Sequence, residues 1–397
     1  MKNAPYREWR TYSTKVGGRS YQVATKPGAF AYGRLDPATL LLAEHIEVTP
    51  GDSVVHMNCG NGLVGAVARL GGQAGRVLLT DRNIVSVDAT RRTLSANGVG
   101  DGEVFLGHGA YALPKDLPAD TVAIRIPKER LALLQLMVDA FVTLRVGGRC
   151  YIAGATNEGI KTAATTIERL FGNARVLSRD SSHRVISAVK RAETPASGDG
   201  LDRPFLQSDA FNEIDATLRG RPYTLYSRPG VFSWDHVDEA TTILANTMEI
   251  REGHSVLDLG CGCGALGVVA ASLSGRGALT MVDADVEAVR SATRSADANG
   301  IVNYRALTSD VAGAVLDERF DLVVTNPPFH VGKTTDLDVP LQFIHDAWNV
   351  LASGGRLFLV ANRTLPYEQV IKHRFGNVAN LYDGPRFKVL TATMLSS

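Results

Sequence analysis

The sequence contains one long internal repeat, with an offset of 202 residues between its two copies (253 − 51 = 202). Residues 51–60 align with residues 253–262, and the same shift carries residues 26–30 onto residues 228–232. Further landmarks keep this register or depart from it slightly: Asp81 and Asp283, Ala96-Asn97-Gly98 and Ala298-Asn299-Gly300, Gly147-Gly148-Arg149 and Gly354-Gly355-Arg356, Phe171-Gly172-Asn173 and Phe375-Gly376-Asn377. A register held over so long a stretch indicates two copies of one domain.

The length of the chain and the stretch between the copies define the predicted domain limits. With 397 residues and 45% hydrophobic content, the chain suffices for two or three domains with real cores. Residues 192–209 are rich in Pro, Ser, Gly and Asp without a sustained period, which is typical of a linker. We therefore predict one domain over residues 1–191 and a second over residues 210–397.

Short apolar runs alternate with helical patterns in each copy. In the second copy, strands are expected at residues 255–259, 278–282, 320–324 and 356–360, and helices at residues 265–273, 286–298 and 339–351. Residues 379–395 are β-rich around a Gly384-Pro385 turn, which predicts a closing antiparallel hairpin. The predicted fold class is α/β, with two tandem, doubly wound, Rossmann-like domains built on parallel sheets with right-handed crossovers.

Charge and cysteine content limit the classes of function. A net charge of +1 and a pI near 7.7 exclude a uniformly basic nucleic-acid-binding protein, so phosphate contacts must come from local patches. One candidate patch is the N-terminal segment, which interleaves basic and aromatic residues: Lys2, Tyr6, Arg7, Trp9, Arg10, Tyr12, Lys15, Arg19, Tyr21, Lys26 and Arg34. This mixture fits base stacking and phosphate contact, and a solvated arm is the alternative.

The four cysteines and the start of the chain bear on metals and location. Cys59, Cys150, Cys261 and Cys263 do not form a disulfide framework for a chain of this size, and no His stands at zinc-ligand spacing from the last two. The first residues are polar and charged, and no apolar run approaches membrane-spanning length. We expect a reduced, cytoplasmic protein with neither a metal site nor a membrane anchor.

A rigid polar motif follows the apolar run at residues 320–324, where a buried parallel strand is expected to end. It reads Thr325-Asn326-Pro327-Pro328-Phe329-His330. Ligands of open α/β sheets bind at the carboxyl ends of strands, and each proline restricts its own φ and the preceding residue. The Asn326 amide and the Pro327 carbonyl would thus be fixed acceptors for an NH2 group on a planar ring, with Phe329 as a stacking face. A plain turn is the alternative.

A glycine-rich loop containing Gly260, Gly262 and Gly264 follows the first strand of the second copy. Glycines let a backbone approach a ligand and present amides at the start of a helix. The letters from Gly262 also match a dinucleotide fingerprint, with Asp283 at the distance expected for a ribose contact. Asp258 favours the ammonium of a methionine moiety instead, because a carboxylate before the glycines would repel a pyrophosphate.

Two further acids are expected at the next strand ends. Asp283 would accept hydrogen bonds from a ribose diol, and Asp310 would meet an adenine amino group. For each carboxylate taken separately, a helix N-cap or a solvated loop acid is the alternative. Acids at three successive strand ends make that alternative less favourable.

The glycine loop, Asp283, residues 326–332 and residues 228–233 together resemble the ribosomal RNA guanine-N2 methyltransferases of the RsmC/RlmG type. That family pairs a degenerate N-terminal domain with an active C-terminal one, so the resemblance covers nearly the whole chain. It implies seven-stranded sheets with an antiparallel C-terminal strand, S-adenosyl-L-methionine as cofactor, and methylation of a guanine N2 amine in ribosomal RNA, first of all small-subunit RNA. Ribosomal RNA or a ribosomal subunit is the implied partner, and a monomer is expected.

The resemblance also implies roles for individual residues. Asn326, Pro327 and Phe329 would be catalytic, and Asn326 would also contact the cofactor. Phe329, His330 and Phe232 would bind the substrate, with Phe232 in a lid over the cofactor and base. A structural histidine and a packed turn are the respective alternatives for His330 and the lid.

The first copy lacks these groups. His56 stands where the second copy has Asp258, and residues 125–128 read Arg-Ile-Pro-Lys where the second copy has Asn-Pro-Pro-Phe. We expect a binding or supporting role for this copy, with Arg125 and Lys128 holding RNA phosphates. A solvated basic loop is the alternative.

Other functions remain open on the sequence alone. The acceptor could be a large-subunit RNA guanine, an adenine N6 amine or a protein glutamine. The glycine loop also permits a nicotinamide-dependent oxidoreductase, and two inactive copies would make a non-enzymatic RNA-binding protein.

Overall fold

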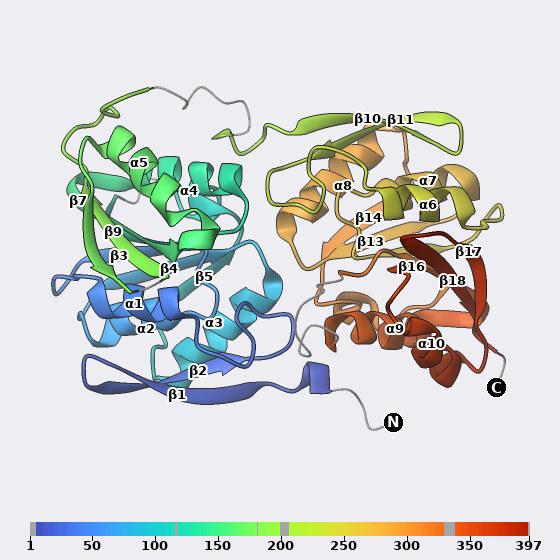
Figure 1. The fold of residues 1–397 in the computed structure, drawn as a ribbon, viewed down its shortest axis with the longest axis horizontal. Coiled ribbons are helices and arrows are strands. Elements are labelled where there is room, and N and C mark those ends of the chain that lie inside the picture. Colours follow the sequence, from blue (N-terminus) through green and yellow to red (C-terminus); the bar gives the residue numbers. More distant parts are fainter. Residues whose placement is uncertain (1–4, 116–117, 181, 199–205, 329–337, 396–397) are drawn as a thin grey trace. The chain divides into compact units, whose positions relative to one another are not determined.

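The computed structural model describes residues 5–115, 118–180, 182–198, 206–328 and 338–395 (Figure 1). The chain divides into two compact units, Glu8–Ala210 (the N-terminal unit) and Phe211–Ser397 joined by the first residues up to Arg7 (the C-terminal unit). The short 3-10 helix η1 (Pro5–Arg7) therefore belongs to the C-terminal unit. The predicted domain over residues 1–191 would place η1 in the N-terminal unit. No sequence pattern signals that Tyr6 of η1 contacts Asp310, which lies 304 positions away.

The N-terminal unit alternates strands and helices after an initial hairpin (Figure 1). Its elements are β1 (Arg10–Val16), β2 (Arg19–Thr25), α1 (Pro37–His45), β3 (Ser53–Met57), α2 (Leu63–Leu70), β4 (Arg76–Asp81), α3 (Ile84–Ala96), β5 (Glu103–Leu106), η2 (Gly109–Ala112), β6 (Ala119–Arg125), α4 (Arg130–Thr143), β7 (Leu144–Ala155), η3 (Thr156–Glu158), α5 (Ile160–Phe171), β8 (Arg175–Arg179) and β9 (His183–Val189).

The C-terminal unit repeats this order. Its elements after η1 are β10 (Asn212–Leu218), β11 (Arg221–Ser227), α6 (Glu239–Thr247), β12 (Val256–Leu259), α7 (Ala265–Ser274), β13 (Leu279–Asp283), α8 (Val286–Ala298), β14 (Tyr304–Thr308), η5 (Gly313–Val315), β15 (Phe320–Thr325), α9 (Asp338–Val350), β16 (Leu351–Asn362), α10 (Tyr367–Phe375), β17 (Ala379–Asp383) and β18 (Phe387–Thr393).

Each unit is built on a seven-stranded sheet, and the two sheets have the same strand order. The orders are β5-β4-β3-β6-β7-β9-β8 and β14-β13-β12-β15-β16-β18-β17. The first five strands of each order are parallel, and the last two pair antiparallel. The predicted duplicated, doubly wound fold with an antiparallel C-terminal strand is therefore confirmed.

The pattern of β15 shows why this sheet is buried on both faces. Leu322 and Val324 pack with residues of α6, α7 and α8, whereas Val323 between them packs with residues of α9 and α10. Successive side chains of a strand point to opposite faces, so a continuous apolar run requires helices on both sides. Burying one such side chain contributes about 1.5–3 kcal/mol to the free energy of folding. The helices packed on both faces of the sheet therefore fix the position of β15 and of its end.

Residues 10–25 of the basic N-terminal segment form a hairpin rather than a solvated arm. Arg10–Val16 pairs antiparallel with Arg19–Thr25, and Tyr21 is buried against the core of the N-terminal unit. An equivalent hairpin of β10 and β11 begins the second copy. The solvated arm, the alternative interpretation of this segment, is wrong for residues 10–25, because Tyr21 and Val23 supply the buried side of a strand. The predicted base and phosphate contacts of the segment stay predictions.

Candidate active site

The fold brings the predicted cofactor and substrate residues to one edge of the C-terminal sheet. The parallel strands β14, β13, β12 and β15 are neighbours in that order. Asp258 lies in β12, Asp283 ends β13, Asp310 follows β14 and Asn326 follows β15. Carboxyl ends of parallel strands share one edge of a sheet, which is where ligands bind in open α/β folds.

The glycine loop leaves room for a ligand at one of its three glycines. Gly260, Gly262 and Gly264 all have positive φ. A Cβ at Gly260 would lie 2.8 Å from the Phe343 ring, and a Cβ at Gly264 would lie 3.0 Å from Ala292, so both positions are closed by packing. A Cβ at Gly262 would meet nothing within 4 Å. Gly262 is therefore the point of the loop that a cofactor can approach.

Asp283 is held in place by backbone amides. Its Oδ2 accepts a hydrogen bond from the Gly262 N–H at 2.9 Å, and its Oδ1 accepts one from the Asp285 N–H at 2.9 Å. One bond on each oxygen fixes the orientation of the carboxylate. The arrangement fits a ribose diol beside Gly262, and the ribose contact stays a prediction.

Asp258 lies beneath the glycine loop and is fully buried. Its Oδ2 accepts a hydrogen bond from the Gly267 N–H at 2.7 Å, and its Oδ1 has no partner among the described residues. Burial, with the Asp283 charge as a smaller cause, raises the pKa of the Asp258 carboxyl to about 7. The carboxyl suits a nearby cation such as the expected ammonium, and its contact with the cofactor stays a prediction.

The raised pKa of Asp258 predicts that its contribution to stability falls as pH rises. The ordinary pKa is 3.8, so between that value and about 7 the folded state binds more protons than the unfolded state. Relative to Asp258→Asn, which keeps an acceptor for Gly267, the wild-type protein should lose about 2 kcal/mol of unfolding free energy between about pH 5 and pH 8. Urea unfolding at both pH values measures this difference. The exposed Asp317→Asn is the control, and an equal change in both variants would contradict the buried carboxyl.

Asn326 has a fixed amide orientation and an unused acceptor. Its Nδ2 donates to the Thr241 hydroxyl at 3.0 Å and to the Asp238 carboxylate at 3.5 Å. The NH2 side must face Asp238, because a carboxylate only accepts. The Asn326 Oδ1 is buried and has no hydrogen-bond partner among the described residues. Such an atom fits the predicted acceptor for an exocyclic amine.

Sequence reasoning missed the two residues that hold this amide. Asp238 caps α6 by accepting from the Ala240 and Thr241 N–H groups, and its other oxygen faces Asn326. The signal was present as an Asp followed three residues later by Thr, which occurs in both copies as Asp36/Thr39 and Asp238/Thr241. It was hidden because a capping residue is expected to serve its own helix.

The remaining predicted residues of the C-terminal unit have different surroundings. Asp310 accepts a hydrogen bond from the Tyr6 hydroxyl at 2.5 Å. Pro327 is buried and Phe232 is 63% exposed. Phe329 and His330 lie outside the described residues, so their predicted roles stay predictions.

The cysteines beside the loop have no nucleophilic character. Cys261 and Cys263 are buried, and burial raises the pKa of Cys263 to about 11 and that of Cys261 well above its usual value. Both thiols stay protonated near neutral pH. The described residues contain no group of three His, Cys, Asp or Glu that could hold a metal ion. Within the same residues, no helix is both long and apolar enough to cross a bilayer.

The first copy has filled its own site. Arg125, at the position of Asn326, is buried and forms ion pairs with Asp36 at 2.7 Å and Glu158 at 2.9 Å. Its guanidinium lies 5.1 Å from the centre of the Phe30 ring. Burial lowers the pKa of His56, the counterpart of Asp258, to about 3, so this position is neutral. The guanidinium of Arg125 thus faces protein groups, which argues against the predicted phosphate contact.

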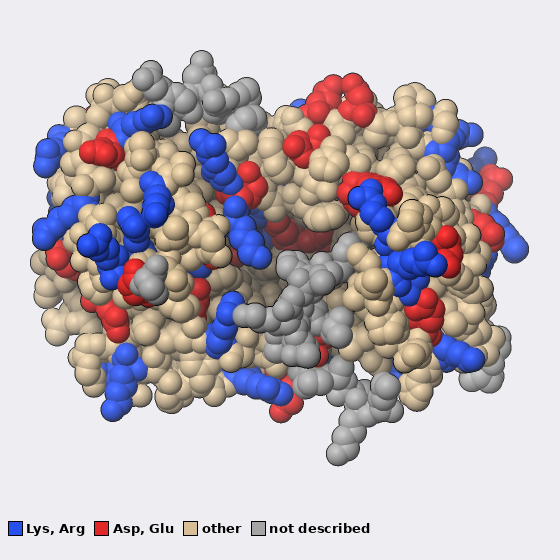
Figure 2. Space-filling model, viewed as in Figure 1, with Lys and Arg blue, Asp and Glu red and all other residues tan. Residues whose placement is uncertain are grey.

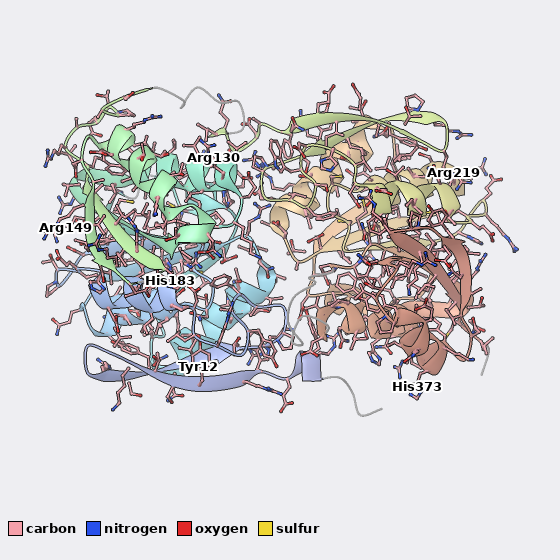
Figure 3. All side chains as sticks on the ribbon, viewed as in Figure 1. Tyr12, Arg130, Arg149, His183, Arg219 and His373 are labelled. Carbon is pink, nitrogen blue, oxygen red and sulfur yellow. The ribbon has the colours of Figure 1, made fainter. Side chains whose placement is uncertain are left out.

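Lys128 has the surroundings that Arg125 lacks. It lies in the exposed turn between β6 and α4, two residues before the exposed Arg130 (Figure 3). On the face shown in Figure 2, Lys and Arg side chains form separate clusters on the surface of the N-terminal unit, with acidic side chains among them. A phosphate contact by Lys128 stays a prediction.

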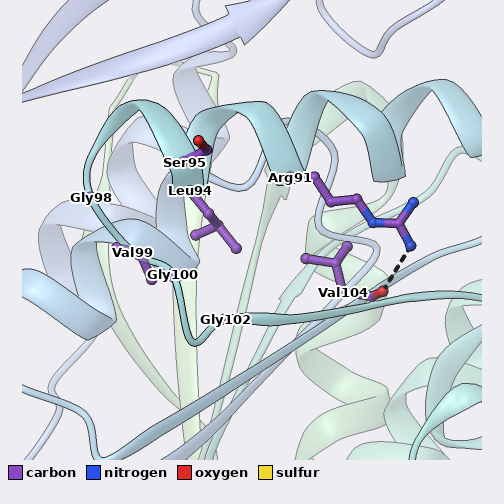
Figure 4. A pocket seen from close by; sticks show the side chains of 8 residues that line it. All are labelled: Arg91, Leu94, Ser95, Gly98, Val99, Gly100, Gly102 and Val104. Atoms are coloured by element: carbon purple, nitrogen blue, oxygen red, sulfur yellow. Dashed lines mark hydrogen bonds between the residues drawn. The ribbon is translucent and has the colours of Figure 1, made fainter.

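A surface hollow of the N-terminal unit lies at the amino end of β5, away from the carboxyl ends of the strands (Figure 4). Its volume is about 410 Å³, and it lies beside the loop between α3 and β5. Its one charged side chain, Arg91, already donates to the Val104 carbonyl at 3.3 Å. Glycines and aliphatic side chains make up most of the rest, so the hollow has little to orient a ligand.

Comparison with known proteins agrees with this geometry. Residues 20–187 and 222–391 each match the model of the family described as methyltransferase small domain. The ribosomal RNA small subunit methyltransferases C of Hahella chejuensis and Erwinia tasmaniensis are 34% and 32% identical to the chain, over 71% and 72% of it and 79% of each relative.

A solved structure matches nearly the whole chain. It is the T. thermophilus 16S rRNA N2 G1207 methyltransferase (RsmC) in complex with AdoMet and guanosine, with a TM-score of 0.80, 31% identity, and coverage of 97% of this chain and 98% of that one. Matches in both repeats, in curated relatives and in this structure carry the same assignment. The chain belongs to the methyltransferase small domain family, as a member of its RsmC-type ribosomal RNA guanine-N2 methyltransferases.

Proposed function

We propose that the C-terminal unit transfers a methyl group from S-adenosyl-L-methionine to the exocyclic N2 amine of a guanine in ribosomal RNA, first of all small-subunit RNA. The observation that carries this proposal is the buried Asn326 Oδ1, which is oriented by Asp238 and Thr241 and has no partner among the described residues. The relatives named for small-subunit RNA and the related structure with AdoMet and guanosine support the same substrate.

The residues at the strand ends fit the cofactor. Gly262 offers open space for a close approach, Asp283 beside it offers oriented carboxylate oxygens, and Asp258 lies below the loop with an unpartnered oxygen among the described residues. These residues would hold the ribose and the methionine end, and Asp310 would hold the adenine. When bound, the cofactor supplies a methyl group already activated by a sulfonium.

Asn326 would act by orienting the amine. A guanine N2 nitrogen is a weak nucleophile because its lone pair is delocalised into the ring. If the Asn326 Oδ1 and the Pro327 carbonyl each accept one N–H, the nitrogen is turned so that its lone pair points toward the methyl carbon. Both bonds strengthen as positive charge grows on the nitrogen, so they stabilise the transition state more than the ground state. One proton leaves the nitrogen to water after transfer.

The first copy indicates how a planar group fits this position. There the flat guanidinium of Arg125 pairs with Asp36, the counterpart of Asp238, and lies 5.1 Å from the centre of the ring of Phe30, the counterpart of Phe232. In the second copy a guanine can take the place of the guanidinium, with Phe232 as a stacking face worth about 1–3 kcal/mol. That energy is comparable to the cost of unstacking the base from RNA.

Methyl transfer to defined RNAs tests the proposal. The protein is incubated with labelled cofactor and either naked small-subunit RNA, assembled small subunits or large subunits, and modified nucleotides are mapped by mass spectrometry. We expect N2-methylguanine at a single position of small-subunit RNA. A labelled methyl group found on an adenine, in large-subunit RNA or on a protein glutamine would show that the proposed substrate is wrong. A cytoplasmic location and a monomeric state are part of the proposal, and sedimentation checks the latter.

A further inference from the structure

The start of the chain is packed into the cofactor side of the C-terminal unit. Tyr6 is 2% exposed and joins the apolar cluster that contains Leu259, Val282 and Phe343. Its hydroxyl donates to the Asp310 Oδ1 at 2.5 Å. Burial, and the Asp310 charge after it, raises the pKa of the Tyr6 hydroxyl, so it remains a donor at all physiological pH values.

The next residue acts on the same turn by a second route. Arg7 donates to both oxygens of Asp346, at 2.9 and 2.8 Å. Asp346 is fully buried in α9 and accepts a hydrogen bond from the Ala312 N–H at 3.2 Å. Tyr6 and Arg7 thus hold the turn over residues 310–312 from both of its ends.

This turn contains a strained residue. Val311 has φ of 53° and is buried. The left-handed region is unfavourable for a β-branched residue such as valine, so Val311 keeps this backbone conformation only because its surroundings impose it. The hydrogen bonds from Tyr6 and from Asp346 supply that constraint, and they fix the direction of Asp310 at the end of β14.

We propose that Tyr6 and Arg7 are positioning residues for cofactor recognition, which aim the Asp310 carboxylate at the 6-amino group of the adenine. This inference rests on the proposed function, because it needs S-adenosyl-L-methionine at the strand ends. Tyr6 uses one of the acceptor positions of Asp310, and a carboxylate can accept from the hydroxyl and an amine together. The contact would make the enzyme selective for an adenine against a hypoxanthine, whose 6-oxygen cannot donate.

Calorimetry with two product analogues tests the selectivity. The probes are S-adenosylhomocysteine and S-inosylhomocysteine, which differ at the 6-position of the base. We expect the wild-type protein to bind the adenine form about tenfold more tightly, or better, because one hydrogen bond to a charged acceptor is at stake. Tyr6→Phe should lower the ratio of the two affinities at least threefold. In a protein that already carries Asp310→Asn, adding Tyr6→Phe should not change the ratio further.

Tyr367→Phe is the matched control. Tyr367 is equally buried in the same apolar cluster, and its hydroxyl has no hydrogen-bond partner among the described residues. It should leave the ratio unchanged, which separates positioning from a general loss of packing. If Tyr6→Phe does not fold, Arg7→Gln serves instead. A glutamine can still donate to the buried Asp346 carboxylate, which also accepts a hydrogen bond from Gln342 at 2.7 Å, and the Arg7 side chain is 43% exposed.

The outcomes separate this inference from the proposed function. A wild-type ratio near one, or an unchanged ratio in Tyr6→Phe and Arg7→Gln, overturns the positioning role while methyl transfer to RNA continues. Loss of binding of both probes by the wild-type protein, together with absence of methyl transfer, overturns the proposed function itself.

Discussion

Asn326→Ala is expected to lower kcat for methyl transfer by about 10²–10³-fold while leaving the affinity for S-adenosyl-L-methionine near that of the wild-type protein. The expected loss is that found when one oriented polar group facing developing charge is removed from an active site. Cofactor affinity should persist because the glycine loop and Asp283 do not depend on Asn326 in this structure. Single-turnover kinetics on the RNA substrate and calorimetry with the cofactor measure the two effects separately.

Asn380→Ala is the control for this variant, because Asn380 is exposed on β17 and away from the strand ends. It should retain full activity. Turnover of Asn326→Ala within threefold of the wild-type rate would show that the amide oxygen does not orient the amine. An equal loss of cofactor binding would instead show that Asn326 acts by holding the cofactor, which the resemblance also implies, rather than by orienting the amine.

The fold was predictable because the sequence contains the same domain twice. Apolar runs such as residues 320–324 and helical patterns such as residues 286–298 are strong local signals of strands and helices. Because the sequence is repeated, each signal occurs in both copies. The hairpin of β10 and β11 was not predicted. Exposed and buried residues alternate regularly in both strands, but the two strands pair only with each other and not with the main sheet, so they lie outside the α/β repeat that the helical and apolar patterns predict.

The site was predictable where one residue acts through its own local geometry. Asn326, Asp283 and the glycines follow strands directly, so strand prediction places them. Asp238, Thr241 and Tyr6 act through tertiary contacts with residues 88, 85 and 304 positions away, respectively, and no local pattern encodes these contacts. Arg125 was misplaced for the opposite reason. A basic residue close to Pro127 and Lys128 suggests an exposed loop, but Arg125 is paired with Asp36 and Glu158 inside the unit.

The ion pairs of Arg125 give the first copy a structural role that the second copy does not need. Asp36 and Asp238 each cap the helix that precedes the main sheet, and each also accepts from the residue at the end of the fourth strand of that sheet. Asp238 uses its second oxygen for this, whereas Asp36 uses both oxygens, because Arg125 donates to its capping oxygen and to the other one. In the second copy that residue is a neutral amide with a spare acceptor. In the first copy it is a guanidinium that uses Asp36, Glu158 and the Phe30 ring as partners.

Arg125→Met is therefore expected to destabilise the N-terminal unit by about 3–5 kcal/mol, because it leaves the Asp36 carboxylate buried without its cation. Hydrogen exchange with mass spectrometry reads the two units separately, through peptides from β6 and from β15. Exchange should accelerate in β6 and stay unchanged in β15. Arg145→Met, which removes an ion pair with Asp120 whose arginine is 53% exposed, should cost at most about 1 kcal/mol.

A second substitution decides whether the loss comes from the charge. Asp36→Asn keeps the cap of α1 and removes the uncompensated carboxylate, so Arg125→Met with Asp36→Asn should recover part of the lost protection. Recovery would show that the first copy kept the capping acid of a methyltransferase site and made it half of a buried ion pair. Unchanged exchange in β6 of the single variant would mean that the ion pairs of Arg125 contribute nothing to this unit's stability, which would overturn the structural role.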